Sequence, residues 1–450
     1  MKTVFYFFLL FNGSLGFNYL SAQTRMTLDQ AIKIALENNL SIQQSELNEK
    51  TAESNYLQSK AAYLPSINGN WSGTRNFGTT FDNVTFQRVQ RTTDNSFTGI
   101  QGSITLFNGM TNHHTLHQNE YTVAAAQATT RKTENDVLTN VVLTYLQLLF
   151  DSENIRISQD KIKIIQEQLD KREKEFNVGK ITKTEILNLK SQIASEKLNL
   201  INQQNQLEKD KLKLAQELLL DPEINYQYDF PDTSGKQIQI PAETLSDILK
   251  EGLSRMPEIQ EVDLKEKASF YGLRKARSGH YPTISLNGNF GSSYSSNGIF
   301  NPTTFKVEDT PYIDQLRQNQ NQSISIQVSV PIFNRLTVRN QVRSANLSHQ
   351  QSVFQQKVAR NTLTQKIQQA YLDVVSAVNK YSAVQEQLIS LKENFKMAQI
   401  RYDAGALDFF SFHETLNNQT KASSELLQAK YDFLFKRKIL DLYLGKTLSF

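Results

Sequence analysis

Hydrophobic residues recur along this chain with two different periods. From Ser323 to Val330 every second residue is apolar, and the residues between them are Ser or Gln. Strict alternation of this kind predicts a β-strand with one apolar and one polar face. The same reading places strands at about 65–75, 97–107, 282–292 and 322–332. Short strands of this type suit a membrane barrel, and a soluble two-sheet sandwich has the same alternation.

The connections between the paired strands favour the barrel. Residues 76–95 and 291–320 are rich in Asn, Thr and Ser and poor in apolar residues, as are the long outer loops of membrane barrels. Four strands cannot close a barrel, because single-chain barrels begin at about eight strands. An open sheet edge in lipid would leave backbone groups unsatisfied. A membrane position therefore requires several copies of the chain, and three copies would supply twelve strands.

The second period is helical. No proline or glycine occurs from Thr111 to Val178, which allows a helical rod of about 100 Å. Apolar and polar residues share a heptad seam in both halves of the chain. Beyond Ile155 and Tyr381 this stripe is thin, which predicts a wall of helices with water on both sides. The seam comprises Leu138, Val141, Tyr145, Leu148, Ser152, Ile155, Gln159, Ile162, Gln166, Leu169, Glu173 and Phe176, then Tyr371, Val374, Val378, Tyr381, Gln385, Leu388, Lys392, Phe395, Gln399 and Tyr402.

A glycine interrupts each long helical pattern. Gly179 and Gly405 permit a helix C-cap and a reversal of the chain. Thr182 and Asp408 are suited to cap return helices at about 182–220 and 408–444. The sequence therefore predicts two long helical hairpins whose tips lie near residues 179 and 405.

The chain contains an internal duplication. The segment from Thr27 aligns with that from Thr244 at an offset of 217 (244 minus 27), and Pro65 aligns with Pro282 at the same offset. From Phe107 onward the offset is 226 (405 minus 179 at the tips). Each copy reads as one helix ending before the proline, two strands and a helical hairpin. The predicted divisions are 1–22 as a signal peptide, 23–220 as the first repeat, 221–241 as an inter-repeat linker and 242–450 as the second repeat.

Composition narrows the function. Cysteine is absent, which excludes disulfides, thiolate metal sites and cysteine catalysis. The net charge of +4 implies no nucleic-acid partner. The segment 1–22 has a basic residue, a short apolar core and small residues, as a secretory signal peptide does. We therefore expect an exported protein.

Motifs for chemistry are few. His113 and His117 lie at i, i+4 and form a possible metal pair, and the alternative is a hydrated helix start just below the membrane. No zinc-protease pattern, phosphate-binding glycine loop or nucleophile elbow is present in the sequence. We expect no enzyme, no resident metal and no cofactor.

Together these features resemble the TolC family of outer-membrane channels. The resemblance implies a mainly α fold with β-strands, built from a duplicated helix–strand–strand–long helical hairpin unit. It implies a homotrimer that shares a 12-stranded transmembrane β-barrel and a long periplasmic α-helical barrel, with residues 221–241 in an equatorial belt. Such a protein is the outer-membrane exit duct of a tripartite efflux or type I secretion system in a Gram-negative bacterium. Its partners are a periplasmic adaptor protein, an inner-membrane pump and outer-membrane lipid.

The resemblance also assigns residues at the tips. Family members carry acidic residues six and nine positions after the tip glycine, and in the second repeat these form a ring at the closed aperture. Here those positions are Ser411, which departs from the pattern, and Glu414, which matches; Glu185 matches in the first repeat. A solvated helix-surface glutamate is the alternative. The residues expected to contact the adaptor are Val178, Gly179, Lys180, Ile181, Ala404, Gly405, Ala406 and Leu407.

Two other functions compete with a passive duct. A surface-exposed structural or adhesive coiled-coil protein would explain the heptads, but not the alternating strands or the duplication. A periplasmic enzyme would need a catalytic cluster that the sequence does not offer.

Overall fold

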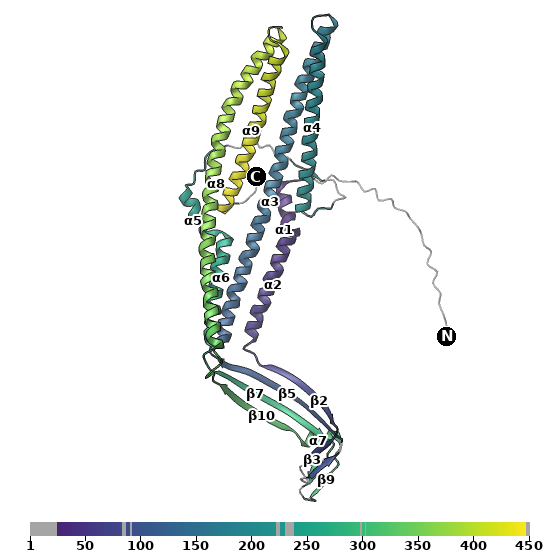
Figure 1. Cartoon of the computed structure of the whole chain (residues 1–450), viewed down its shortest axis with the longest axis vertical. Coiled ribbons are helices and arrows are strands. Elements are labelled where there is room, and N and C mark those ends of the chain that lie inside the picture. The colour runs from purple at the N-terminus through teal and green to yellow at the C-terminus, as the bar shows by residue number, and fades with distance from the viewer. Residues whose placement is uncertain are drawn as a thin grey trace, which may run out of the picture.

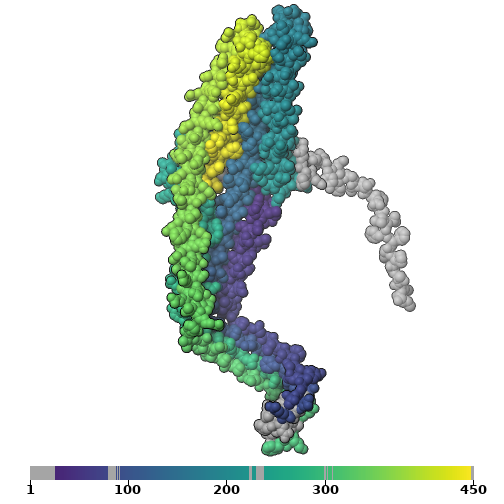
Figure 2. Space-filling view, viewed as in Figure 1, coloured from purple at the N-terminus to yellow at the C-terminus, as the bar shows by residue number. Residues whose placement is uncertain are grey.

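The computed structural model describes residues 25–82, 87–90, 92–221, 226–229, 238–297, 299–301 and 303–446. The predicted signal peptide at 1–22 and much of the linker at 221–241 lie outside the described residues. The molecule is elongated: helices run along most of its length, and a sheet continues from one end (Figure 1). In the space-filling view the helices form a long narrow wall from which the sheet departs at an angle (Figure 2).

Two pairs of short helices flank the lower part of this wall. They are α1 (Leu28–Asn38) with α2 (Leu40–Ala61), and α5 (Leu245–Arg255) with α6 (Pro257–Ser278). The prediction of a single continuous helix before the proline of each repeat was wrong. Asn39 is extended, and its Oδ1 accepts a hydrogen bond from the Ser41 amide at 2.9 Å, which starts a new helix. In the second copy Met256 is extended and Pro257 opens the next helix.

The two long hairpins match each other in length. Helices α3 (Thr111–Asn177) and α8 (Thr337–Asp403) have 67 residues each, and α4 (Lys183–Glu217) and α9 (Phe409–Tyr443) have 35 each. At 1.5 Å per residue, each long helix extends about 100 Å. Left-handed residues also recur at equivalent places before the long helices and after the return helices: Gly109, Met110, Leu219, Arg335, Leu336 and Gly445. The duplication thus extends to backbone conformation.

Four antiparallel strands form the main sheet, in the order β10-β7-β5-β2. They are β2 (Ser66–Asn76), β5 (Thr93–Asn108), β7 (Thr283–Ser295) and β10 (Asn321–Ser329). Paired residues project to the same side of a sheet, and the register places apolar residues together. Ile100 pairs with Phe290, and Ile104 with Leu286, which also pairs with Ile326. One face is therefore apolar and the other is lined by Ser, Asn, Gln and Thr.

The strand connections contain more structure than the sequence suggested. Residues 76–95 and 291–320 were predicted as long polar loops. Within their described parts lie β3 (Thr79–Asp82) paired with β4 (Gln87–Gln90), β8 (Ile299–Asn301) paired with β9 (Lys306–Glu308), and helix α7 (Tyr312–Gln318). Gln315 fixes α7 to the sheet, because its buried Nε2 donates to the carbonyl oxygen of Ser295 at 3.1 Å. Strand β5 begins four residues before its predicted start and β7 ends three residues after its predicted end, whereas β10 ends at Ser329, before the predicted 332.

The main hydrophobic core lies midway along the helices, where α1, α3, α4, α5, α8 and α9 meet. Tyr145 is fully buried there, and its single hydroxyl hydrogen lies between the carbonyl oxygen of Met26, at 3.2 Å from the hydroxyl oxygen, and that of Asp229. This links α3 to strand β1 (Arg25–Met26), which pairs in parallel with β6 (Gln227–Tyr228). Among the described helices, none combines the length and apolar character needed to cross a membrane.

A second, smaller core lies toward the tips. It contains Ile165, Leu169, Ile186, Leu189, Ile193 and Leu416, from α3, α4 and α9. Here the predicted seam was partly wrong: Gln159 and Gln166 are exposed, whereas Ile165 and Arg172 are buried. Helix α3 contacts both α4 and α9, so its buried stripe faces the space between those two helices.

Candidate functional site: the hairpin tips

Both tips are closed by the same backbone turn. The Gly179 amide donates to the carbonyl oxygen of Phe176 at 2.9 Å, and the Lys180 amide donates to that of Glu175 at 3.0 Å. At the second tip the Gly405 amide donates to the Tyr402 oxygen at 3.1 Å and the Ala406 amide to the Arg401 oxygen at 2.8 Å. Each pair of bonds is a Schellman motif. Both glycines have φ of 75°, a left-handed conformation that L-residues rarely adopt.

The predicted adaptor-contacting residues differ in exposure. Val178, Gly179, Lys180, Ala404, Gly405 and Ala406 are exposed, whereas Ile181 and Leu407 are half-buried. Ile181 packs against the small core. Apart from Lys180, these exposed residues are Gly, Ala or Val, and Val178 is 70% exposed. The tips therefore present short apolar side chains and one lysine at the end of the wall.

The return helices begin differently in the two halves. Asp408 caps α9: its Oδ1 accepts from the amides of Phe410 at 2.9 Å and Ser411 at 3.0 Å. The Ser411 hydroxyl donates to Asp408 Oδ2 at 2.5 Å, and these bonds hold the pKa of Asp408 below its usual value. Thr182 occupies the equivalent position before α4 but makes no side-chain capping bond. Of the two predicted capping residues, only Asp408 makes side-chain hydrogen bonds that cap its helix.

A contact between α3 and α8 joins the two hairpins near their tips. The Arg172 guanidinium stacks on the Tyr402 ring at 3.9 Å, and its Nη2 donates to the Tyr402 carbonyl oxygen at 3.0 Å. Tyr402 in turn stacks on Phe412 with ring centroids 4.4 Å apart. Glu185 lines the adjoining groove with Arg172 and Tyr402. Lys171 and Asp403 add an exposed ion pair at 2.8 Å.

Glu414 lies in a different groove. It is exposed, and the lining residues on the facing helix α4 are Asn188, Ser191 and Gln192. Within one chain, therefore, the three predicted aperture residues are not brought together: Glu185 is on the tip groove, Glu414 is between α4 and α9, and Ser411 is bonded to Asp408.

Next to Glu414 is a buried histidine that sequence reasoning missed. His413 is 7% exposed, and neither of its ring nitrogens has a hydrogen-bond partner. Burial and the nearby Lys161 ammonium lower the pKa of His413 to about 4. Lys161 itself pairs with Glu196 at 2.6 Å, with both side chains nearly buried. A lone histidine in a helical pattern offers no signal of this environment, and the same holds for Arg172.

The histidines at the start of α3 contact each other and a nearby glutamate. The rings of His113 and His117 are 4.5 Å apart and nearly perpendicular. His117 Nδ1 lies 2.8 Å from Glu120 Oε2. In the described part of the chain no three histidine or acidic residues are grouped so that they could hold a metal ion.

Comparison with known proteins identifies the class to which this architecture belongs. The family model for outer membrane efflux proteins matches residues 31–218 and 248–446. The chain belongs to this family, as its resemblance to TolC channels predicted.

Individual relatives are distant in sequence. The chain is 22% identical to the outer membrane protein TolC of Escherichia coli over 327 residues, which is 72% of this chain and 64% of TolC. It is 23% identical to the cation efflux system protein CusC of Escherichia coli over 416 residues, covering 89% of this chain and 82% of CusC. Among solved structures, the CmeC outer membrane channel of Campylobacter jejuni matches with a TM-score of 0.78 at 19% identity, covering 93% of this chain and 85% of CmeC. The match with TolC thus spans less than two thirds of that protein.

Proposed function

We propose that three copies of this chain form the outer-membrane exit duct of a tripartite efflux or type I secretion system. The sheet carries this proposal. Its apolar face is exposed in the single chain: Ile324, Ile326 and Trp71 are each more than 65% exposed. Its outer strands, β2 and β10, each pair on one side only within the described sheet. Three such sheets joined edge to edge would satisfy the open edges and make a twelve-stranded barrel with an apolar exterior.

Side chains at the turn from strands to helices support a membrane boundary there. Large apolar and aromatic residues are exposed at this level, as expected of side chains that lie at a lipid surface. They include Leu64 at 68%, Tyr281 at 58%, Ile332 at 95% and Phe333 at 78%. The helices would then extend about 100 Å into the periplasm, and most of the mass would lie there.

The duct would be passive and would depend on partners. A periplasmic adaptor and an inner-membrane pump would deliver the cargo, and the chain itself would catalyse no reaction. Two repeats, 23–220 and 242–450, would each contribute one hairpin to the tunnel wall, with 221–241 as an equatorial linker. The exposed tip residues 178–180 and 404–406, with Ile181 and Leu407 behind them, would form the adaptor-contacting surface.

The aperture would be lined by carboxylates. Glu414 is exposed on a polar stretch of α9, and three copies would bring three such groups to one narrow mouth, where they attract cations. Glu185 would contribute from the neighbouring hairpin. Where the family has an acid, Ser411 instead binds Asp408, so the negative charge lies one turn nearer the tip.

The single tryptophan of the chain gives a direct test. Trp71 lies on the apolar face of β2. In reconstituted protein its fluorescence should be quenched by phospholipids brominated in the acyl chain and spared by aqueous acrylamide. The matched control is Trp71→Phe combined with Asn70→Trp, which moves the indole to the polar face and should reverse both results. Equal quenching of the two proteins by brominated lipid would refute the barrel.

A further inference from the structure

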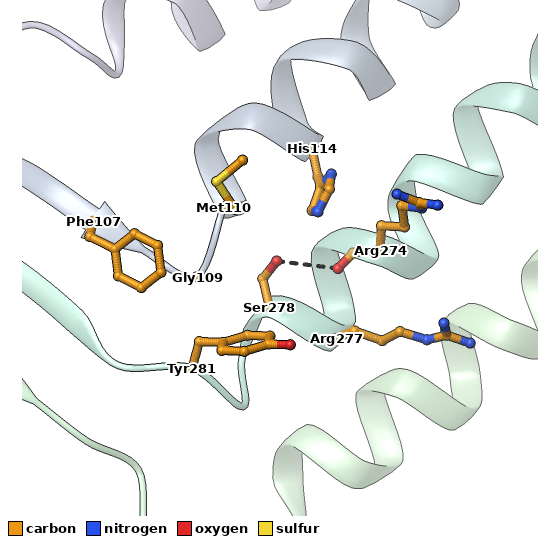
Figure 3. A pocket seen from close by; sticks show the side chains of 8 residues that line it. All are labelled: Phe107, Gly109, Met110, His114, Arg274, Arg277, Ser278 and Tyr281. Carbon is orange, nitrogen blue, oxygen red and sulfur yellow. Dashed lines mark hydrogen bonds between the residues drawn. The ribbon is translucent and has the colours of Figure 1, made fainter.

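A pocket lies where the strands meet the helices, at the ends of the two central strands of the sheet. Its walls come from the end of β5 (Phe107), the start of α3 (Met110 and His114), the end of α6 (Arg274, Arg277 and Ser278), and Tyr281 just before β7. Figure 3 shows the rings of His114 and Tyr281 on either side of Ser278. Its volume is about 290 Å³, enough for a small polar group.

A β-bulge turns this pocket toward the apolar face of the sheet. The register between β5 and β7 shifts between Thr105 and Phe107, so that Phe107 pairs with Ile284. Ile284 belongs to the apolar face, because it also pairs with Val328. Without the shift, Phe107 would project to the polar side, since successive strand residues alternate. The pocket is therefore continuous with the surface that we assign to lipid.

The floor of the pocket is formed where the backbone at the start of α3 packs closely against the end of α6. Gly109 has φ of 65°, and a Cβ there would lie 2.5 Å from the carbonyl oxygen of Ser278 and 2.7 Å from Tyr281 Cβ. Only glycine permits α3 and α6 to approach in this way. The position of the surrounding side chains is thus fixed by packing of the backbone.

The pocket is basic and its charges are not neutralised by the protein. Among the ion pairs of the described part of the chain, none involves Arg274 or Arg277, and Arg274 lies over the Phe270 ring at 4.7 Å. His114 Nδ1 is buried without a hydrogen-bond partner. Burial lowers the pKa of His114, and the charges of His113 and Arg274 act in the same direction. Two guanidinium groups without a carboxylate partner, beside aromatic side chains, match a phosphate group whose substituents are apolar.

We infer that this pocket binds the phosphate headgroup of an anionic phospholipid in the periplasmic leaflet of the outer membrane. The inference rests on the proposed function, which places the junction at that leaflet. Basic pockets at the membrane boundary hold anionic headgroups in other membrane proteins. Because the pocket is built on the two central strands, β5 and β7, joining of β2 and β10 between copies leaves it open. Each trimer would carry three such lipids at the junction of the strands and the helices.

The experiment is native mass spectrometry of the detergent-purified complex with added phosphatidylglycerol. The test variant is Arg274→Gln with Arg277→Gln. The control is Arg339→Gln with Arg343→Gln, which removes the same charge from exposed positions in the first two turns of α8 but leaves the pocket intact. All four arginines are exposed, so replacing them should not disturb folding. An unchanged trimer mass shows that both variants assemble.

Affinity for phosphatidylglycerol should fall about tenfold or more in the test variant and remain within about twofold in the control. Equal affinity in the two variants would overturn the inference, while trimers and channels would leave the proposed function standing. Displacement of the lipid by inorganic phosphate at equal concentration would assign the pocket to free phosphate and would also overturn it. Absence of any trimer in the wild-type protein would instead refute the proposed function.

Discussion

The glycine at the second hairpin tip provides a quantitative test of the turn geometry. At Gly405 the backbone has φ of 75°, and a Cβ would meet nothing within 4 Å. The cost of Gly405→Ala is therefore conformational rather than steric, about 1–2 kcal/mol for a left-handed L-residue. Alanine also restricts the unfolded chain, which offsets about 0.4–1 kcal/mol. The closed turn should lose about 1 kcal/mol net, which corresponds to about a fivefold change in its opening equilibrium.

Hydrogen exchange at the tip measures this opening. Peptides that contain the Ala406 amide, which is bonded to Arg401, should exchange about fivefold faster in Gly405→Ala. Gly405→Asn should show a smaller effect, because asparagine tolerates the left-handed region. The control is Gly288→Ala, at an open strand position without positive φ, which should leave tip exchange unchanged. Exchange in Gly405→Ala that equals wild type would refute the assignment of a strained turn. Gly179→Ala should reproduce the result at the first tip, where φ is also 75°.

Three further predictions concern the same region. Glu414→Ala should raise conductance at low voltage in planar bilayers, and unchanged conductance with unchanged cation preference would contradict the aperture proposal. Asp408→Ala should destabilise the start of α9 by about 1 kcal/mol, whereas Thr182→Ala, which removes no capping bond, should be close to neutral; equal losses in hydrogen-exchange protection would disprove this contrast. Because burial lowers the pKa of His413 to about 4 from 6.5, stability from the neutral ring is complete above about pH 6.5 and is lost as pH falls toward 4, by at most about 3 kcal/mol. The thermal midpoint of His413→Asn should depend less on pH in this window, and an identical pH profile would contradict burial of the ring.

Sequence reasoning succeeded where one local rule decides the structure. The left-handed glycines set both tips, and the uninterrupted stretch from Thr111 set a helix that ends at Asn177. Alternation from Ser323 placed a strand that runs from Asn321 to Ser329. In these segments no tertiary contact had to be known, because the period and the chain breakers specify the element.

Failures occurred where two neighbours compete for one residue. The seam on α3 was drawn through Gln159 and Gln166, but contact with both α4 and α9 buries Ile165, and Arg172 is buried against Tyr402 of α8. A heptad pattern describes one partner, and this helix has two. The break at Asn39 was missed because no proline or glycine occurs between Leu28 and Leu64, although a capping residue at that point was a usable signal.

The pairing of β5 with β7 could not be predicted from either strand alone. It joins the two repeats in one sheet and brings Phe107 beside Ile284 through a bulge. Register between distant strands depends on the packing of both faces, and the alternation in each strand is compatible with several pairings. The same limit applies to Arg172 of α3 and Tyr402 of α8, whose contact depends on how the two hairpins pack against each other.

The proposed duct requires three chains to share one barrel. The most direct measurement is the native mass of the protein after extraction from outer membranes in mild detergent. We expect a particle with three mature chains, because four strands per chain leave two open edges that other copies must satisfy. A monomer that is soluble without detergent would mean that the strands cover their apolar face within one chain, and it would contradict the shared barrel.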